Sequence, residues 1–506
     1  GVGDLNEVHR METFDMDATN GFLDSKWYHL YCSVQRCNSA LRVLNAATDE
    51  QVNGRVSRIA EMKVLRAHYY FELSRLFNKI PYFDENVEIS QYPDIPNNEF
   101  TRDEILSMLA EEMLDAAEQL PASQPEVGRI HKYIALAYAA KIKLYQAYQQ
   151  DETTHAVTSI NKELLREVVS LCDQVTASNR YGLLDDFQGL DLVANENGKE
   201  SVFAIQYSMN DGTESAGRIN WSNLLNSPGG GSPYGGDGFF LPSQDLINAY
   251  QTDANGLPDF NYQSKSDYSW AVLNNGVYTL QNTTPNVDPR LDFVVGRPTI
   301  TWKTYPDKPC EGWVRDKETY GYNCAKRFWV SPESSDMFNG WPWGASQLNW
   351  QIIRYADILL WKAEALIELN EGNGLETARD LINQIRNRAR NSAYVKDFND
   401  HSNYAANYLV NPYPADVWNQ DYARQALRWE TRLEKALEGE RFFDLVRWGI
   451  VETTMNKYIA AESDNRIYYA NAHFTGGKDE YYPVPNNQYG FSGGKYVQNP
   501  GYAPFN

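Results

Sequence analysis

Helical periodicity in two separate stretches is the feature that most constrains the fold. Apolar residues recur at intervals of three and four in the stretch 25–180, for example at Leu30 and Val34, and again in the stretch 349–460, for example at Leu359. The first run of such positions is Trp27, Leu30, Tyr31, Val34, Cys37, Leu41 and Leu44. This spacing places apolar side chains along one face of an α-helix. The sequence therefore predicts two blocks of amphipathic helices.

The expected helices are long and follow one another closely. Thr101 and Glu104 form a capping box, which marks the start of one helix. The others are expected at about 25–44, 55–77, 129–149, 162–178, 353–369, 375–390 and 415–439, and from 453 onward. Helices of this length in antiparallel pairs suggest a mainly α fold with a tetratricopeptide-like helical-repeat scaffold, although the repeat signature itself is absent.

The stretch 181–348 differs in composition from both helical blocks. It holds 18 of the 33 glycines and 7 of the 13 tryptophans. Glycine-rich runs favour loops, and short pieces at Ser201–Tyr207 and Phe293–Val295 resemble strands. We therefore expect a large loop-rich, partly β insertion within a single domain, 1–506, which ends in a Tyr/Pro/Gly-rich tail, 461–506.

The charge of the chain argues against a nucleic-acid partner. There are 46 basic and 67 acidic side chains, so the net charge is −21, and phosphates would be repelled. A neutral polysaccharide meets no such obstacle, whereas a strongly sulfated or uronic-acid glycan would need a local basic patch. The residues that could make one are Lys303, Lys308, Arg315, Lys326 and Arg327.

The sequence contains no motif of a catalytic or metal site. None of the seven histidines lies in a Gly-x-Ser-x-Gly or His-Glu-x-x-His pattern, and there is no phosphate-binding glycine loop. We therefore expect no catalysis, cofactor or metal. A glycosidase stays open as an alternative, because its two carboxylates need to be close only in space. The segment Asp253–Gly256 resembles the start of a calcium loop but lacks the later acidic ligand, so a turn is favoured.

Cysteine use leaves two alternatives for the loop between Cys310 and Cys324. The two residues could close this polar, aromatic loop as a disulfide, or they could be buried thiols. The total of five cysteines is odd, so at least one thiol has no partner within the chain.

Polar aromatic rings crowd the loop-rich stretch without helical spacing. A flat ring with a polar edge can stack on a sugar face, and it can equally hold a loop region together by packing. We expect two or three of ten such rings to contact ligand. The strongest local candidate is Trp341-Pro342-Trp343-Gly344, where Pro and Gly hold two rings on an exposed turn. The candidate contacts in this stretch are Trp221, Tyr234, Trp270, Trp313, Tyr320, Trp341 and Trp343.

Several blocks of sequence carry a family resemblance. They are LRAHYYFEL at 65–73 with Ile80-Pro81 after it, Asp288-Pro289-Arg290-Leu291, RYADILL at 354–360, INQIRNRA at 382–389, ETRLEKALEGERFFDLVRWG at 430–449, YPVP at 482–485 and QNPGY at 498–502. In this order they resemble the motifs of the SusD/RagB-like family over nearly the whole chain. Together they are far more specific than any one of them alone.

This resemblance implies a fold, a location and a set of partners. Members of the family are lipoproteins of the bacterial outer membrane that face the cell surface. They capture glycans, and sometimes peptides, and pass them to a TonB-dependent SusC-like transporter, with no catalysis of their own. Their ligand surface lies on the loop-rich side of a tetratricopeptide-like scaffold. The lipidated cysteine that anchors them is not in this chain, so the resemblance implies an anchor that precedes residue 1.

The motif residues themselves are expected to be structural. Arg441, Asp444 and Arg447 are spaced for an ion-pair ladder on a short helix, and Arg354 is expected to be paired when it packs. A ligand site should then lie in the 220–345 insert and in the loop after Pro81, where Tyr92 is a further candidate contact. A peptide-binding importer subunit of the same architecture and a plain helical-repeat scaffold for proteins are the alternative functions.

Overall fold

The computed structural model describes residues 5–213, 217–221, 223–226, 228–229, 231–269, 271–274, 277–280, 285–309 and 311–505. The chain forms two compact units. Unit 1 comprises Gly1–Asn179, Phe442–Lys457 and Asn471–Asn506, and unit 2 comprises Arg180–Arg441 and Tyr458–Ala470. Among the helices of the described ranges, none is long and apolar enough to cross a membrane.

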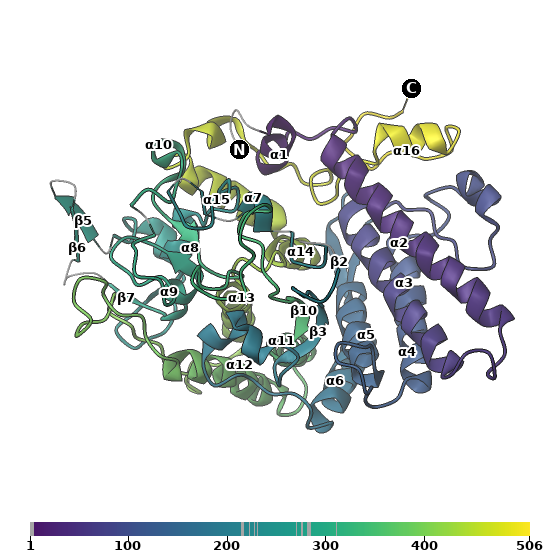
Figure 1. Ribbon diagram of the computed structural model, residues 1–506, viewed down its shortest axis with the longest axis horizontal. Helices are drawn as coiled ribbons and strands as arrows, with labels where there is room; N and C mark the ends of the chain where they lie inside the picture. Colours follow the sequence, from purple (N-terminus) through teal and green to yellow (C-terminus); the bar gives the residue numbers. More distant parts are fainter. Residues whose placement is uncertain are drawn as a thin grey trace. The chain divides into compact units, whose positions relative to one another are not determined.

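Unit 1 is a stack of helices in which each long helix packs on the next one along the chain. Figure 1 shows α2 to α6 side by side, coloured from purple to blue. The helices are α1 (Asn6–Glu12), α2 (Gly21–Ala46), α3 (Arg55–Phe77), α4 (Arg102–Gln119), α5 (Lys132–Ala147), α6 (Lys162–Ala177) and α16 (Asn486–Phe491), with the 3-10 turn η1 (Ile89–Asp94). The strands β1 (Tyr148–Gln150) and β2 (Val157–Ile160) form an antiparallel pair. Two more helices, α14 (Arg441–Arg447) and α15 (Val451–Glu462), begin or end at the boundary with unit 2.

The starts of these helices follow local chemistry. The side chain of Asn20 accepts hydrogen bonds from two backbone N–H groups at the start of α2, and Asn161 does the same at α6. The predicted capping box of Thr101 and Glu104 is confirmed at α4. The helix predicted at 129–149 is shorter, because its last residues leave the helix and pair as β1 with β2.

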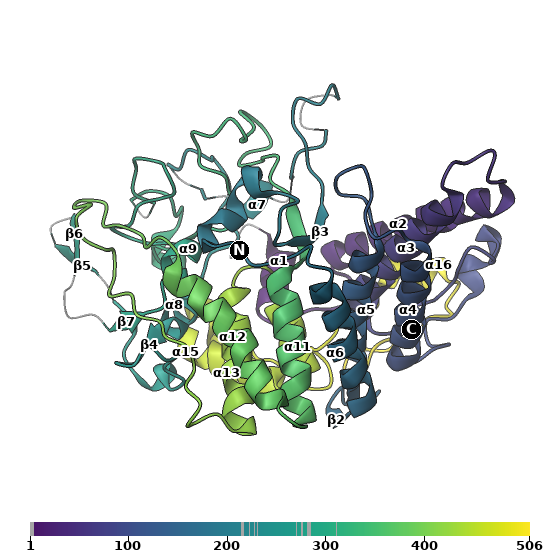
Figure 2. The same cartoon turned by 90° about the horizontal axis from the view of Figure 1, so that it is seen from below.

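Unit 2 combines three long helices with short strands and loops. The helices α11 (Tyr355–Leu369), α12 (Gly374–Asn391) and α13 (Gln420–Glu434) pack together, and Figure 2 shows them in green. The shorter helices are α7 (Asn223–Asn226), α8 (Gln244–Ala249), α9 (Arg290–Val294) and α10 (Lys317–Tyr320). The 3-10 turns are η2 (Phe187–Asp191), η3 (Val193–Asn195) and η4 (Tyr262–Ser264), and η5 (Ile467–Asn471) lies at the end of the unit. Small residues such as Ala363, Ala378 and Ala426 let the three long helices approach closely.

The strands of unit 2 occur only as two-stranded antiparallel pairs within the described ranges. The pairs are β3 (Ser201–Ile205) with β10 (Trp350–Arg354), β4 (Gln251–Thr252) with β7 (Asn286–Val287), β5 (Ala271–Asn274) with β6 (Val277–Leu280), and β8 (Val295–Gly296) with β9 (Cys324–Ala325). The predicted fold class, a mainly α scaffold with a loop-rich and partly β stretch, is confirmed. The division of a single domain into four consecutive stretches stays a prediction.

Two local predictions were wrong. The segment Phe293–Val295 was expected to be a strand, but Phe293 lies in α9. This helix forms there because Pro289 supplies a helical φ and the carboxylate of Asp288 accepts a hydrogen bond from the N–H of Arg290. The helix expected at 415–439 is only α13, since Asn419 caps its start and residues with positive φ follow its end.

A buried network of ion pairs joins α9, α12 and α13 in unit 2. Arg290 pairs with Asp288 (Nη2–Oδ2, 2.7 Å), with Glu430 (Nη1–Oε1, 2.6 Å) and with Glu434 (Nη1–Oε2, 3.1 Å). Arg386 reaches Glu430 from α12 (Nη1–Oε2, 3.0 Å). None of these five side chains is exposed to solvent. Burial of a charge is costly unless a partner compensates it, so the pairing fixes how these elements pack.

The network continues to α11 and to β3. Arg354, at the start of α11, pairs with Glu200 (3.0 Å), Glu434 (2.6 Å) and Glu438 (2.9 Å), and Arg388 pairs with Glu200 and Glu434. The predicted pairing of Arg354 is thus confirmed. The connected cations are Arg290, Lys303, Arg327, Arg354, Arg386, Arg388 and Lys435, and the connected anions are Asp191, Glu200, Asp288, Asp357, Glu430, Glu434 and Glu438. The two sets are equal in number, so the network carries no net charge.

The motif on α14 is structural as well. Arg447 pairs with Asp444 (2.9 Å), which confirms this step of the predicted ladder. The Arg447 guanidinium also lies over the rings of Tyr145 and Tyr148 within unit 1, with centroid distances of 5.2 and 5.1 Å. A residue held in this way is not available to a ligand.

We expect Glu434→Gln to destabilise the protein by roughly 3–5 kcal/mol, because Arg354 and Arg388 then lose a buried anionic partner. Urea unfolding followed by circular dichroism measures this change. The matched control is Asp421→Asn on the same helix, whose carboxylate is 94% exposed and pairs with Arg424, and which should cost less than about 1 kcal/mol. Equal effects of the two substitutions would show that burial does not set the strength of the network.

Acid should weaken the same network. Burial alone would raise the pKa of Glu434, but Arg388, Arg354 and Arg290 outweigh it and hold the pKa at about 2, against 4.5 for an ordinary glutamate. The unfolded chain therefore binds a proton first, and the stabilisation present above pH 4.5 is lost as the pH falls toward 2. Urea unfolding at about pH 5 and about pH 3 tests this. The loss should be smaller in Glu434→Gln, and an identical loss in both proteins would contradict the assignment.

Candidate functional site

The aromatic residues of the loop-rich stretch divide into a buried set and an exposed set. The buried set is an aromatic core around Tyr234, Trp302, Trp313 and Trp329, none more than 1% exposed. The Trp302 indole N–H donates to the Tyr234 hydroxyl (3.1 Å), which donates to the carbonyl of Val330 (2.6 Å). The predictions of Tyr234 and Trp313 as ligand contacts are therefore wrong, because these rings are needed to give a region of short strands a core of its own.

The exposed set contains Trp221, Trp341 and Trp343, which are 42%, 58% and 45% exposed. We call these three side chains the tryptophan platform. The rings of Trp221 and Trp341 meet edge to face, with centroids 4.9 Å apart and planes at 84°. The Trp343 ring lies against Gly235, where a β-carbon would sit 3.6 Å from the indole. Exposed rings that gather in one place, unlike single exposed rings, make this surface the candidate for ligand binding.

Backbone pairing brings the platform together from two distant segments. The segment Asp336–Gln347 folds back on itself, with Phe338 N–H donating to the carbonyl of Ala345 (2.9 Å) and Gln347 N–H to that of Asp336 (3.1 Å). Its turn contains a cis Trp341–Pro342 peptide bond. We call this segment the tryptophan hairpin.

Side chains and a neighbouring segment fix the stem of the tryptophan hairpin. The Asp336 carboxylate accepts from Gln347 (Nε2–Oδ1, 2.6 Å) and from the Ser334 hydroxyl (3.0 Å). The N–H of Asn220 donates to the carbonyl of Ser346 (2.8 Å), which places Trp221 beside the hairpin. The base of the hairpin is therefore held by side chains and by a neighbouring segment, while Trp341 and Trp343 at its turn are exposed.

The remaining predicted contacts lie elsewhere. Tyr320, at the end of α10, is half-buried, and its ring centroid is 6.1 Å from that of Tyr468. Tyr92 belongs to unit 1, where it stacks on Phe83 at 3.9 Å and accepts a hydrogen bond from Arg42 (2.9 Å). Trp270 lies outside the described residues. Cys310 does too, so the disulfide with Cys324 also stays a prediction.

The basic residues of the stretch do not form an open patch. Lys303 pairs with Asp191 (3.3 Å), and Arg327 pairs with Asp191 (3.1 Å) and Glu438 (3.3 Å). Two more pairs, Lys308 with Glu311 (3.8 Å) and Arg315 with Asp237 (3.6 Å), lie nearer the surface. The buried Lys326 amine donates to the carbonyls of Asp292 (2.7 Å) and Thr301 (3.0 Å). Each of these cations is thus matched by an acid or by backbone carbonyls.

The calcium-like segment is a turn, as predicted. The Asp253 carboxylate accepts hydrogen bonds from the N–H groups of Asn255 (2.8 Å) and Leu257 (2.9 Å). In the described part of the chain, no group of three or more His, Cys, Asp and Glu side chains is arranged to hold a metal ion.

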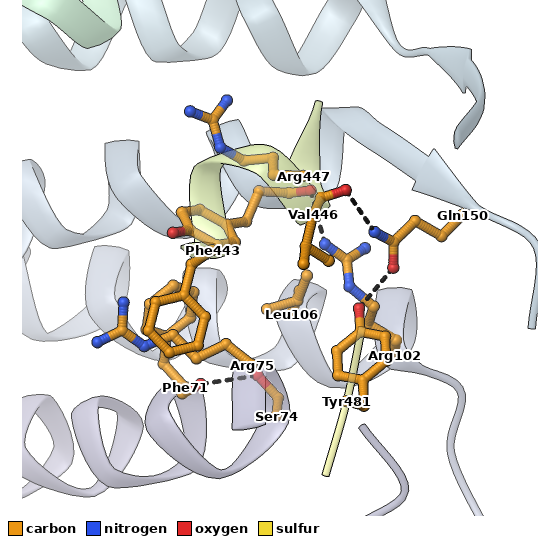
Figure 3. A pocket seen from close by; sticks show the side chains of 11 residues that line it. Phe71, Ser74, Arg75, Arg102, Leu106, Gln150, Phe443, Val446, Arg447 and Tyr481 are labelled. Carbon is orange, nitrogen blue, oxygen red and sulfur yellow. Dashed lines mark hydrogen bonds between the residues drawn. The ribbon is translucent and has the colours of Figure 1, made fainter. Parts of the chain in front are cut away.

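A small cavity in unit 1 is lined by residues of α3, α4 and α14 (Figure 3). The Arg75 guanidinium covers the ring of Phe443 at 4.1 Å, and the Gln150 amide donates to the carbonyl of Val446 (3.3 Å) and accepts from the Tyr481 hydroxyl (2.5 Å). The cavity volume is about 10 Å³, the space of one water molecule. It is therefore a packing feature and not a ligand site.

Comparison with known proteins matches the chain to one family over most of its length. A model described as the SusD family matches residues 199–502, and one described as "Starch-binding associating with outer membrane" matches residues 4–144. The chain is 25% identical over 456 residues to the SusD-like protein P2 of Formosa agariphila, which covers 88% of this chain and 76% of the relative.

Solved structures share the fold at lower identity. Surface glycan-binding protein A from Bacteroides fluxus has a TM-score of 0.69 at 21% identity, over 99% of this chain and 90% of that one. Surface glycan-binding protein A from Bacteroides thetaiotaomicron, in complex with laminarihexaose, has a TM-score of 0.61 at 19% identity, with the same coverage. The motifs found in the sequence and the match over residues 199–502 agree, and the chain belongs to the SusD family.

Proposed function

We propose that this protein captures oligosaccharide or polysaccharide at the cell surface and passes it to a TonB-dependent SusC-like transporter of the outer membrane. The tryptophan platform is the observation that carries the proposal. Its three rings offer apolar faces to solvent, and each indole has an N–H edge, which suits the mixed apolar and hydroxyl surface of a sugar. We assign no catalytic role to the protein.

The relatives support a carbohydrate as the ligand. One solved relative holds laminarihexaose, and another is called a laminarin-binding SusD-like protein. The description of the model that matches residues 4–144 supports an association with the outer membrane. The lipid anchor and the transporter are taken from the family resemblance.

Charge pairing favours a neutral glycan over an acidic one. The basic side chains that could have bound sulfates or carboxylates are compensated within the protein, among them Lys303 and Arg315. The nearest acidic group along the tryptophan hairpin, Asp336, would repel an anion and can accept hydrogen bonds from sugar hydroxyls. A net charge of −21 also repels an acidic glycan at long range.

We expect Trp341→Ala and Trp343→Ala each to weaken glycan binding by about 1–2 kcal/mol, or roughly 5- to 30-fold in Kd, because each removes one stacking ring. Isothermal titration against a panel of neutral glycans, beginning with laminarin, measures this. Tyr322→Ala is the matched control, since it removes another exposed ring of the same stretch that is 39% exposed and not part of the platform.

Binding that survives the double Trp341→Ala/Trp343→Ala substitution would place the ligand elsewhere. Binding of peptides with no binding of any neutral glycan would favour the peptide-importer alternative. Release of reducing sugar by the purified protein would instead reveal a glycosidase.

Binding of a neutral glycan should depend little on salt. Stacking and hydrogen bonds between uncharged groups are not screened by ions, so we expect Kd to change less than about twofold between about 0.05 M and 0.5 M NaCl. The same titrations at the two salt concentrations give the answer. Loss of affinity by a factor of ten or more would indicate an acidic glycan and overturn the charge argument.

A further inference from the structure

A cavity of about 600 Å³ lies in unit 2, and no ring of the tryptophan platform lines it. Its apolar wall includes Phe187, Phe293 and Val330, which are buried. The rings of Phe187 and Phe293 stack with centroids 5.8 Å apart. The volume is in the range of sites that hold small molecules, and the buried wall means that the space exists before any ligand arrives.

The cavity is also lined by polar residues, some of which reach solvent. It is lined by Thr304, Ser331, Glu333, Ser334 and Asp336, of which Thr304 and Glu333 are exposed. The Thr304 hydroxyl donates to that of Ser331 (2.7 Å). The hydroxyls and carboxylates of this lining can form hydrogen bonds with the hydroxyls of a sugar, while the buried apolar side chains shape the space around it.

The basic residues of the cavity wall already form ion pairs or hydrogen bonds with other groups of the protein. Lys303 and Arg327 both pair with Asp191, at one end of the buried ion network. Burial lowers the pKa of Lys326 to about 7, with Lys303 and Arg297 acting in the same direction and Asp292 opposing them. The wall therefore offers little positive charge to an anion, while its network contacts keep it rigid.

The cavity is connected to the tryptophan platform through Asp336. This carboxylate lines the cavity, and the same residue closes the stem of the tryptophan hairpin. Trp341 lies five positions after Asp336, a span of at most about 18 Å. A single oligosaccharide could therefore contact both sites.

We propose that this cavity is a second carbohydrate site, which takes one uncharged sugar residue, a chain end or a branch, of a glycan that stacks on the tryptophan platform. The proposal rests on the proposed function and deepens it. The platform would stack on the sugar faces of the glycan chain, and the cavity would form hydrogen bonds with the hydroxyls of one sugar residue. An acidic sugar is disfavoured because Glu333 and Asp336 face it.

The test blocks the mouth of the cavity and leaves the platform unchanged. Thr304→Trp places an indole at an exposed position of the lining, and the matched control is Val417→Trp, which places an indole at a position that is 41% exposed and lies outside both the lining and the platform. Leu192→Trp is a second blocking variant, since Leu192, which lies between η2 and η3, lines the cavity and is 54% exposed. Circular dichroism confirms that each variant is folded.

The probe is the tightest-binding member of a panel of neutral hexasaccharides that begins with laminarihexaose. We expect Thr304→Trp and Leu192→Trp to weaken binding about tenfold and Val417→Trp to leave it within about twofold. A ligand-detected NMR experiment with the matching monosaccharide should give a signal with Trp341→Ala/Trp343→Ala and none with Thr304→Trp.

The outcomes separate the two proposals. Wild-type affinity in both blocking variants overturns the cavity site and leaves the platform in place. Failure of the wild-type protein to bind any neutral glycan overturns the proposed function, and the cavity site with it. Tighter binding of a uronic-acid oligosaccharide through the cavity would contradict the assignment of an uncharged residue.

Discussion

The ion pairs around Glu434 are the contacts on which the rest of unit 2 depends. This one carboxylate meets arginines from α9, α11 and α12, and each of these arginines has a second acidic partner. Charges buried this deeply tolerate few arrangements, because every displaced partner leaves a charge without compensation. The network therefore determines how the long helices, the β3–β10 pair and the start of α9 pack together.

The same network explains why the most recognisable residues of the family do not bind ligand. Arg354, Arg386, Arg388, Glu430 and Glu434 come from three different sequence motifs, and all of them are buried. Their charged groups pair with one another, and Arg354 and Arg386 also donate to backbone carbonyls. The ligand contacts that we propose lie instead in the loops with exposed rings and in the cavity beside them. The residues that stabilise unit 2 are thus different from the residues that we propose to contact the ligand.

In the loop-rich stretch, aromatic residues that are buried in a core lie close to aromatic residues that are exposed. Tyr234 is buried in the aromatic core, and the next residue, Gly235, supports the exposed ring of Trp343. Nothing in the local sequence separates Trp313, which is buried, from Trp341, which is not. Both stand among Gly, Pro and polar residues, and the difference arises from contacts with segments far away in the chain, such as that of Trp313 with Tyr234.

The sequence by itself determined the helices, the fold class and the family, because apolar periodicity, helix caps and the order of motifs are local properties of the chain. It also marked the Trp341–Trp343 turn as the strongest candidate among the rings of the loop-rich stretch, although the exposure of these rings was decided by tertiary contacts. Tertiary structure decided the rest. Only folding pairs Asn220 with Ser346 to bring Trp221 to the platform, and only folding joins η2, α9 and the segment 303–336 into a cavity. Such contacts depend on distances between remote segments, which no local pattern encodes.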